Sequence, residues 1–280
     1  MMLANLDWAD RTAFSDSASG LAGADYNYNY SCYGGAHSSE RSKWRQMMIL
    51  VCGGVKGGTG KTTTAVNLGI ERARRGAKVL LVDADPDQES LTDYIANREE
   101  RKAEPSVSVI QVKGVTTSKS LVALSKDYDD VLVDCGGFDS VELRQAVLIC
   151  QAWVVPLNPT QMQVWTMPKL KEVLDGANAM RGEAQLTAYL LGMRLSTNSL
   201  NRARSDLDAV AQEFEGFGVL ATVIHQRAAF ERAEALGLAV TELEKPSESD
   251  RKARDAIAML HDELFGRQPI AQRTGGSDGR

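Results

Sequence analysis

The residues best suited to chemistry lie in one glycine-rich segment early in the chain. It reads Val55, Lys56, Gly57, Gly58, Thr59, Gly60, Lys61, Thr62 and Thr63. Glycines let a backbone wrap around an anion without Cβ clashes, and the N–H groups that begin a helix attract anions. Lys61 would place an ammonium on the outer phosphates of a nucleotide, and the Thr62 hydroxyl would bind Mg²⁺. The segment therefore predicts a phosphate-binding loop for ATP and Mg²⁺, with residues 56–63 contacting the nucleotide.

The spacing of this segment differs from that of the ordinary phosphate-loop motif. The ordinary motif has a glycine five positions before Gly60, and Val55 stands there instead. The segment matches the deviant form Lys-Gly-Gly-x-Gly-Lys-Thr-Thr, whose extra lysine is Lys56. The Lys56 side chain could point away from the adjacent phosphate, or it could be an ordinary solvated lysine.

Carboxylates follow two of the apolar runs. Asp83 and Asp85 come directly after the run 79–82, and Asp134 ends the run 131–133. Because carboxyl ends of parallel strands lie on the ligand side of such a sheet, we expect all three carboxylates near the nucleotide. An acid that ends an apolar strand is typical of a Mg²⁺ ligand in nucleotide hydrolases. Gly136 and Gly137 follow, which favours a mobile loop that senses the nucleotide.

Apolar runs alternate with helical patterns through the rest of the chain. The expected strands are 49–52, 79–82, 107–112, 131–133, 153–157, 186–193 and 219–224. The expected helices are 62–75, 88–100, 121–126, 141–150, 163–180, 203–217 and 247–265. Near-continuous apolar strands between helices indicate strands that are buried on both sides. The pattern predicts an α/β fold: a single P-loop NTPase domain with a mostly parallel sheet and helices on both faces.

The two ends of the chain differ from this regular part. Residues 1–46 show no helical or strand period, so we expect a disordered N-terminal tail or a spurious extension before Met47-Met48. The ATPase domain is expected over 47–266, with a flexible tail over 267–280. No apolar run approaches the ~20 residues of a membrane span, and a net charge of −5 with scattered cysteines points to a cytoplasmic protein.

The deviant loop, together with Asp85 and Asp134, resembles the ParA/MinD superfamily of ATPases. The resemblance implies that Lys56 reaches across a homodimer to the partner's nucleotide, and that Lys61 stabilises the transferred phosphate. It assigns Asp85 to orienting the attacking water, and Thr62, Asp83 and Asp134 to the Mg²⁺ network. The family usually has Gln where this chain has Asp87, so no detailed role is carried over to that position.

Within that superfamily the chain most resembles small ParA-type, or ParF-like, partition ATPases. The resemblance implies an ATP-sandwich homodimer that binds DNA without sequence preference and associates with the nucleoid. A small centromere-binding ParB-like partner would stimulate weak ATP hydrolysis and drive plasmid or chromosome segregation. Non-specific DNA binding needs cations that face phosphates, and the candidates are Arg227, Arg232, Arg251 and Lys252.

Other functions remain as alternatives at this point. A ParA-like ATPase that positions a non-DNA cargo, such as a microcompartment or conjugation or secretion machinery, is the strongest of them. A MinD-like division-site protein would need an amphipathic C-terminal membrane helix, and residues 267–280 lack an apolar face. An iron–sulfur reductase would need cysteines that bridge a dimer, and a cobyrinic acid-type ligase would need a second domain.

Overall fold

The computed structural model describes residues 47–54, 57–85, 88–137, 140–159, 164–196 and 200–266. The expectations for 1–46, for 267–280 and for Lys56 therefore lie outside the described residues. The described strands are β1 (Met48–Cys52), β2 (Val79–Ala84), β3 (Ser108–Gln111), β4 (Asp130–Cys135), β5 (Ala152–Leu157), β6 (Ala188–Leu195) and β7 (Phe217–His225). They form one sheet in the order β3-β2-β4-β1-β5-β6-β7, and every strand pair in it is parallel.

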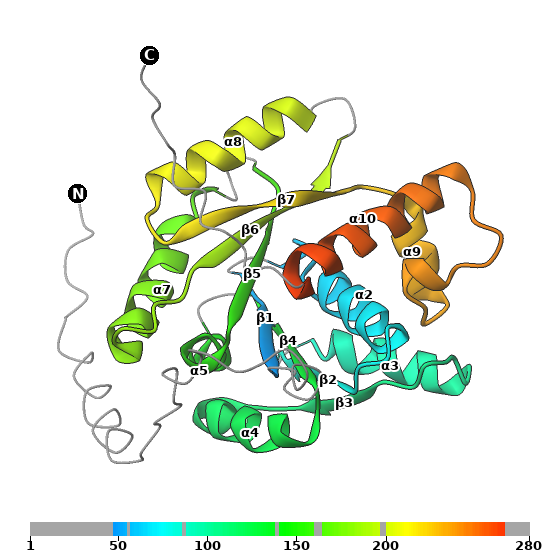
Figure 1. Ribbon diagram of the computed structural model, residues 1–280, viewed down its shortest axis with the longest axis horizontal. Helices are drawn as coiled ribbons and strands as arrows, with labels where there is room; N and C mark the ends of the chain where they lie inside the picture. Colours follow the sequence, from blue (N-terminus) through cyan, green and yellow to red (C-terminus); the bar gives the residue numbers. More distant parts are fainter. Residues whose placement is uncertain are drawn as a thin grey trace, which may run out of the picture. The chain divides into compact units, whose positions relative to one another are not determined.

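Helices cover both faces of this sheet (Figure 1). They are α2 (Lys61–Arg74), α3 (Ser90–Glu100), α4 (Thr117–Leu124), α5 (Val141–Ile149), α7 (Met167–Arg181), α8 (Leu200–Glu213), α9 (Ala228–Ala235) and α10 (Glu248–Phe265). The described part of the chain also contains the short 3-10 helices η2 (Gly114–Thr116), η3 (Ser125–Asp127) and η5 (Val240–Glu242). Buried side chains of α4, α5, α7 and α8 form one hydrophobic core, and those of α2, α3, α9 and α10 form the other. The predicted α/β class, with its parallel sheet and two helical layers, is confirmed.

Two parts of the predicted secondary structure were wrong. The helix expected over 203–217 ends at Glu213, because Gly216 turns the chain with a φ of 90° and Phe217 already belongs to β7. Helix α9 was not predicted. It buries only Ala229 and Ala233, so it carries no run of large apolar residues that would mark a helix.

A buried arginine joins the helix that follows β2 to the segment between α9 and α10. Arg98 of α3 is 1% exposed and forms a two-pronged ion pair with Glu242, with both N–O distances 2.8 Å. Its remaining N–H groups donate to the carbonyl oxygens of Pro105 and Gly237. Every guanidinium nitrogen of Arg98 is thus hydrogen-bonded, which a buried charge requires.

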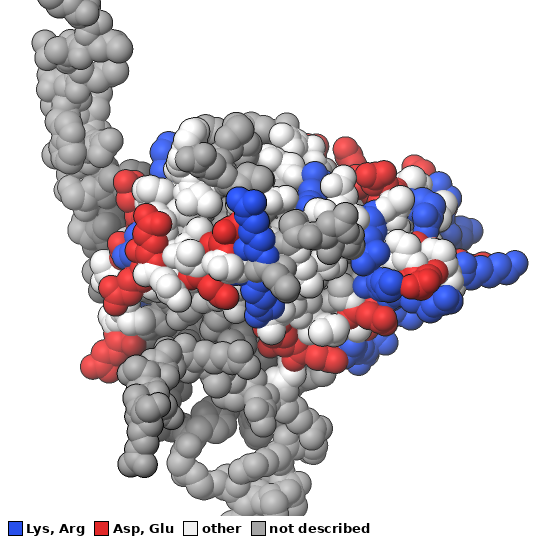
Figure 2. Space-filling view, turned by 90° about the horizontal axis from the view of Figure 1, so that it is seen from above, with Lys and Arg blue, Asp and Glu red and all other residues white. Residues whose placement is uncertain are grey.

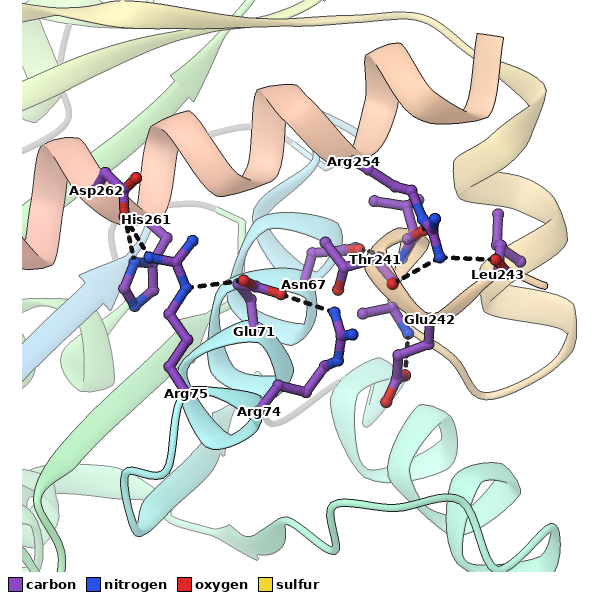
Figure 3. Close-up of polar contacts among 12 residues, drawn as sticks. Asn67, Glu71, Arg74, Arg75, Thr241, Glu242, Leu243, Arg254, His261 and Asp262 are labelled. Carbon is purple, nitrogen blue, oxygen red and sulfur yellow. Dashed lines mark hydrogen bonds and ion pairs between the residues drawn. The ribbon is translucent and has the colours of Figure 1, made fainter. Parts of the chain in front are cut away.

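Helix α10 packs along α2, the helix that begins at the phosphate loop (Figure 3). At one end, Glu71 accepts hydrogen bonds from Arg74 and Arg75, and Arg75 also pairs with Asp262. Nearer the middle of α2, Asn67 Oδ1 accepts the Val240 N–H at 2.8 Å. These contacts hold α2 against its neighbours in the same helical layer.

Candidate nucleotide site

The loop between β1 and α2 reaches α2 through a glycine that no other residue could replace without strain. Gly60 has a φ of 97°, in the left-handed region. A Cβ on Gly60 would also lie 2.5 Å from Met193 Cε of β6. Two reasons therefore fix this glycine, its backbone conformation and the close approach of Met193. Sequence reasoning identified the first, but the contact with Met193 depends on the fold.

The first turn of α2 presents the predicted phosphate-binding residues. Lys61 and Thr59 are buried, whereas Gly57 and Gly58 are exposed. The first turn of α2 itself carries no acidic residue, so no carboxylate within the described helix offsets the positive end of its dipole. The loop therefore combines backbone N–H groups, a lysine and two threonines at a helix N-terminus, which is the arrangement that binds phosphates.

The site joins α2 to β4 through a short hydrogen bond. Thr62 Oγ1 donates to Asp134 Oδ2 at 2.5 Å. Asp134 is the fifth residue of β4, and β4 lies next to β1 in the sheet. The sequence placed both residues in the Mg²⁺ network, and the structure brings them into direct contact.

The environment of Asp134 fits a divalent cation. Its carboxylate is 2% exposed, and its Oδ1 has no hydrogen-bond partner among the described residues. Burial raises the pKa of Asp134 to about 7, with Asp83 and Asp85 adding to the rise, while the Thr62 hydrogen bond and Lys61 lower it. An unsatisfied buried carboxylate oxygen beside a threonine hydroxyl is the hard oxygen donor set that Mg²⁺ prefers.

Asp83 lies directly beside Asp134, because the two are register partners in strands β2 and β4. Its Oδ1 accepts the Asp85 N–H at 3.1 Å. Its Oδ2 accepts both the N–H and the hydroxyl of Thr92, at 3.0 and 2.9 Å. The Asp83 carboxylate therefore ties the loop after β2 to the first turn of α3. Sequence reasoning missed Thr92, because no motif marks a partner nine residues away.

Asp85 lies against the loop that follows β4. A Cβ built on Gly136 would be 2.9 Å from Asp85 Cγ, so the carboxylate occupies the space that a side chain at 136 would need. Asp85 thus stands at the same edge of the sheet as Asp134 and the phosphate loop. The structure brings together Lys61, Thr62, Asp83, Asp85 and Asp134 at this edge of the sheet.

Comparison with protein families tests what this geometry suggests. The family model described as the CobQ/CobB/MinD/ParA nucleotide binding domain matches residues 49–240 of the chain. The chain belongs to this family. The match contains β1, the phosphate loop and the carboxylates after β2 and β4, so it contains the whole site described above.

Individual proteins resemble the chain over different shares of its length. Maintenance of carboxysome distribution protein A of Halothiobacillus neapolitanus is 26% identical over 217 residues, which cover 77% of this chain and 95% of that protein. Protein ParA of Rhizobium radiobacter is 35% identical over 117 residues, which cover 40% of this chain and 50% of that protein. The structure of septum site-determining protein MinD from Pyrococcus horikoshii OT3, complexed with Mg-ADP, has the same fold, with a TM-score of 0.58 at 21% identity over 78% of this chain and 96% of that one.

The cysteine that follows Asp134 is not poised for chemistry in this ParA/MinD family member. Cys135, the residue after Asp134, is fully buried in the core beneath the sheet. Burial and the adjacent Asp134 carboxylate raise the pKa of the Cys135 thiol well above its ordinary value, so the reactive thiolate is disfavoured. These observations fit a packing role for Cys135 better than a redox role.

The candidate DNA-binding cations of this family member gather at α9 and the start of α10. Figure 2 shows Lys and Arg concentrated at the right-hand end, where these two helices lie in Figure 1. Arg232 pairs with Asp250, Lys252 with Glu248 at 2.6 Å, and Arg227 donates to Ser249. Arg251 donates to the Pro246 carbonyl. The structure therefore brings the four cations into one region, interleaved with acids.

No described helix combines the length and the apolar character that a bilayer crossing requires.

Proposed function

We propose that the chain hydrolyses ATP to ADP and phosphate in the site between α2, β2 and β4. The observation that carries this proposal is the Thr62–Asp134 contact, with an unsatisfied Asp134 oxygen beside it at the N-terminus of α2. Bound Mg²⁺ would neutralise charge that develops on the phosphates during transfer. The Thr62 hydroxyl and the Asp134 carboxylate would hold it.

Side chains of the protein would carry out the other roles in ATP hydrolysis. Lys61, buried at the start of α2, places positive charge where the outer phosphates lie against the helix N-terminus. Asp85 orients the attacking water from the loop after β2, and Asp83 holds that loop through the Asp85 N–H. Residues 47–266 would form this ATPase domain, with 1–46 and 267–280 as extensions outside it.

We further propose that ATP gates a homodimer. Lys56, at the start of the loop, would reach the nucleotide of the second copy and supply a cation to its phosphates. A cation supplied in trans makes both dimerisation and hydrolysis depend on the bound nucleotide. The membership of the chain in the MinD/ParA family and the position of Lys56 in the deviant motif support this proposal.

The dimer would bind DNA without sequence preference through the cations of α9 and α10. Pairing two copies doubles the number of cations that meet phosphates, which raises affinity steeply and makes it sensitive to salt. A small ParB-like partner would stimulate hydrolysis and release the DNA, which would let a plasmid or chromosome move over the nucleoid.

A protein assembly is the second candidate cargo. The observation that favours it is the length of the match to the carboxysome distribution protein, which is covered over 95% of its length, whereas Protein ParA is covered over 50%. The neighbouring gene separates the two: a small basic DNA-binding protein favours partition, and a shell or secretion protein favours the protein cargo.

The hydrolysis proposal is tested by single-turnover assays with ATP and Mg²⁺. We expect slow release of phosphate by the purified chain, raised by DNA together with the partner encoded beside it. Absence of ATP binding and of phosphate release under all of these conditions would overturn the proposal.

A further inference from the structure

The loop after β4 and the loop after β2 run side by side at the site. Ala84 and Cys135 are register partners, so the next residues, Asp85 and Gly136, leave the sheet together. The Gly136 N–H points to the Ala84 carbonyl oxygen at 3.5 Å. The two segments that carry Asp85 and Asp134 are therefore in backbone contact where they leave the sheet.

Gly136 is required here by space and not by backbone conformation. Its φ lies outside the left-handed region, unlike those of Gly58 and Gly60, which are 71° and 97°. A Cβ at 136 would meet only Asp85 as its nearest neighbours, at 2.9 Å from Cγ, 2.9 Å from Oδ1 and 3.1 Å from Oδ2. Cβ atoms in real proteins essentially never approach another atom this closely, so a side chain at 136 would displace the carboxylate.

Asp85 is also held by β2, the strand that precedes it. Its N–H donates to Asp83 Oδ1, and Asp83 Oδ2 accepts from Thr92 at the start of α3. The Asp85 N–H is therefore anchored to β2 and, through Asp83, to α3. With this N–H held, the absence of a side chain at Gly136 leaves room for the Asp85 carboxylate in its observed position.

We propose that Gly136 is a positioning residue, whose missing side chain seats the Asp85 carboxylate against the loop that carries Asp134. This inference rests on the hydrolysis proposed above, in which Asp85 orients the water. Gly136 and Asp134 are only two residues apart. A displacement of Asp134 would therefore also move Gly136 relative to the Asp85 carboxylate that packs against it. A change at the phosphate-binding residues would therefore be transmitted through Gly136 to the Asp85 carboxylate, which orients the water.

The first test is Gly136→Ala in the full chain. The substitution leaves Lys61, Thr62 and Asp134 unchanged, so ATP binding and KM should stay within about 3-fold of wild type. The displaced carboxylate should lower kcat at least ~10-fold, because positioned acid–base groups contribute roughly 10²–10⁴ in rate. Gly176→Ala in α7 is the matched control, since its nearest neighbour is Arg144 Nη1 at 4.0 Å, and its kcat should not change. A Gly136→Ala variant with wild-type kcat would overturn the proposal.

The second test needs no hydrolysis and uses a double-mutant cycle on stability without nucleotide. Gly136→Ala should lower the Tm in the wild-type background and cost much less in the Asp85→Ala background, where Cγ and both oxygens are gone. An equal loss of Tm in the two backgrounds would show that Asp85 does not fill the space beside Gly136, and would overturn the proposal. If the wild-type chain releases no phosphate but the cycle shows coupling, the proposed hydrolysis fails while the contact stands.

Discussion

Thr62 Oγ1 donates a 2.5 Å hydrogen bond to Asp134 Oδ2, and this bond joins the first turn of α2 to the end of β4. Both groups are oxygen donors, and the second carboxylate oxygen of Asp134 has no partner among the described residues. In the proposed function, this contact would organise the Mg²⁺ site before any ion arrives, at the point where the phosphate loop becomes a helix.

The first prediction concerns this pair. Thr62→Ala should weaken ATP binding in the presence of Mg²⁺ at least ~10-fold, because it removes one oxygen donor and leaves Asp134 buried without its hydrogen bond. The measurement is calorimetric titration of ATP with and without Mg²⁺. Thr62→Ser retains the hydroxyl and should bind as wild type does. Equal losses for the alanine and serine variants would contradict a role for the hydroxyl.

The second prediction concerns pH and the stability of the nucleotide-free protein. The pKa of Asp134 rises on folding from 3.8 to about 7, so between these values the folded state holds a proton that the unfolded state has lost. The contribution of Asp134 to stability is therefore full below about pH 4 and is lost as the pH rises through 7. Asp134→Asn removes this titration.

Thermal melts from pH 5 to pH 8 measure that loss. The Tm of Asp134→Asn, relative to wild type at the same pH, should climb by several degrees over this range, since 1 kcal/mol moves Tm by roughly 2–4 °C in a domain of this size. Parallel Tm curves for the two proteins would show that Asp134 does not titrate in this window.

The third prediction concerns the buried pair between Arg98 and Glu242. Glu242→Gln should destabilise the fold by about 3–5 kcal/mol, because it leaves the Arg98 charge buried with no counter-charge. Urea unfolding monitored by circular dichroism measures the loss. Lys252→Ala breaks an exposed pair with Glu248 and should leave the unfolding midpoint unchanged. A midpoint for Glu242→Gln equal to that of Lys252→Ala would contradict the account of Arg98.

The fourth prediction concerns DNA. Arg251→Glu and Lys252→Glu should each weaken binding of the ATP-bound protein to random-sequence DNA and lower the salt slope by about 1. Lys171→Glu is the matched control, since α7 lies on the other face of the sheet. Fluorescence anisotropy over a salt series measures both quantities. If Lys171→Glu lost as much affinity as the other two, the region at α9 and α10 would not be the binding surface.

The sequence was most informative where chemistry depends on neighbours along the chain. Lys61 and Thr62 follow the glycines directly, and Asp134 ends an apolar strand, so local patterns located them. The packing of the Asp85 carboxylate against Gly136 could not be predicted from the sequence, because it depends on the register of β2 with β4.

The same limit applies to the fold as a whole. Alternating apolar strands and amphipathic helices predicted the parallel sheet, since each strand carries its own pattern. Helix α9 was missed because its buried positions are alanines. No local pattern marks Arg98 as buried, because its partner Glu242 lies 144 residues away. Contacts distant in sequence leave no local signal.

The claim that ATP gates a dimer is tested most directly by the mass of the protein in each nucleotide state. Sedimentation velocity should show a monomer with ADP and Mg²⁺ and a dimer with ATP and Mg²⁺. The dimer should persist in Asp85→Ala, which binds ATP without turnover, and should be lost in Lys56→Ala, which should still bind ATP. A single mass in all nucleotide states, or a Lys56→Ala variant that dimerises as Asp85→Ala does, would contradict the account.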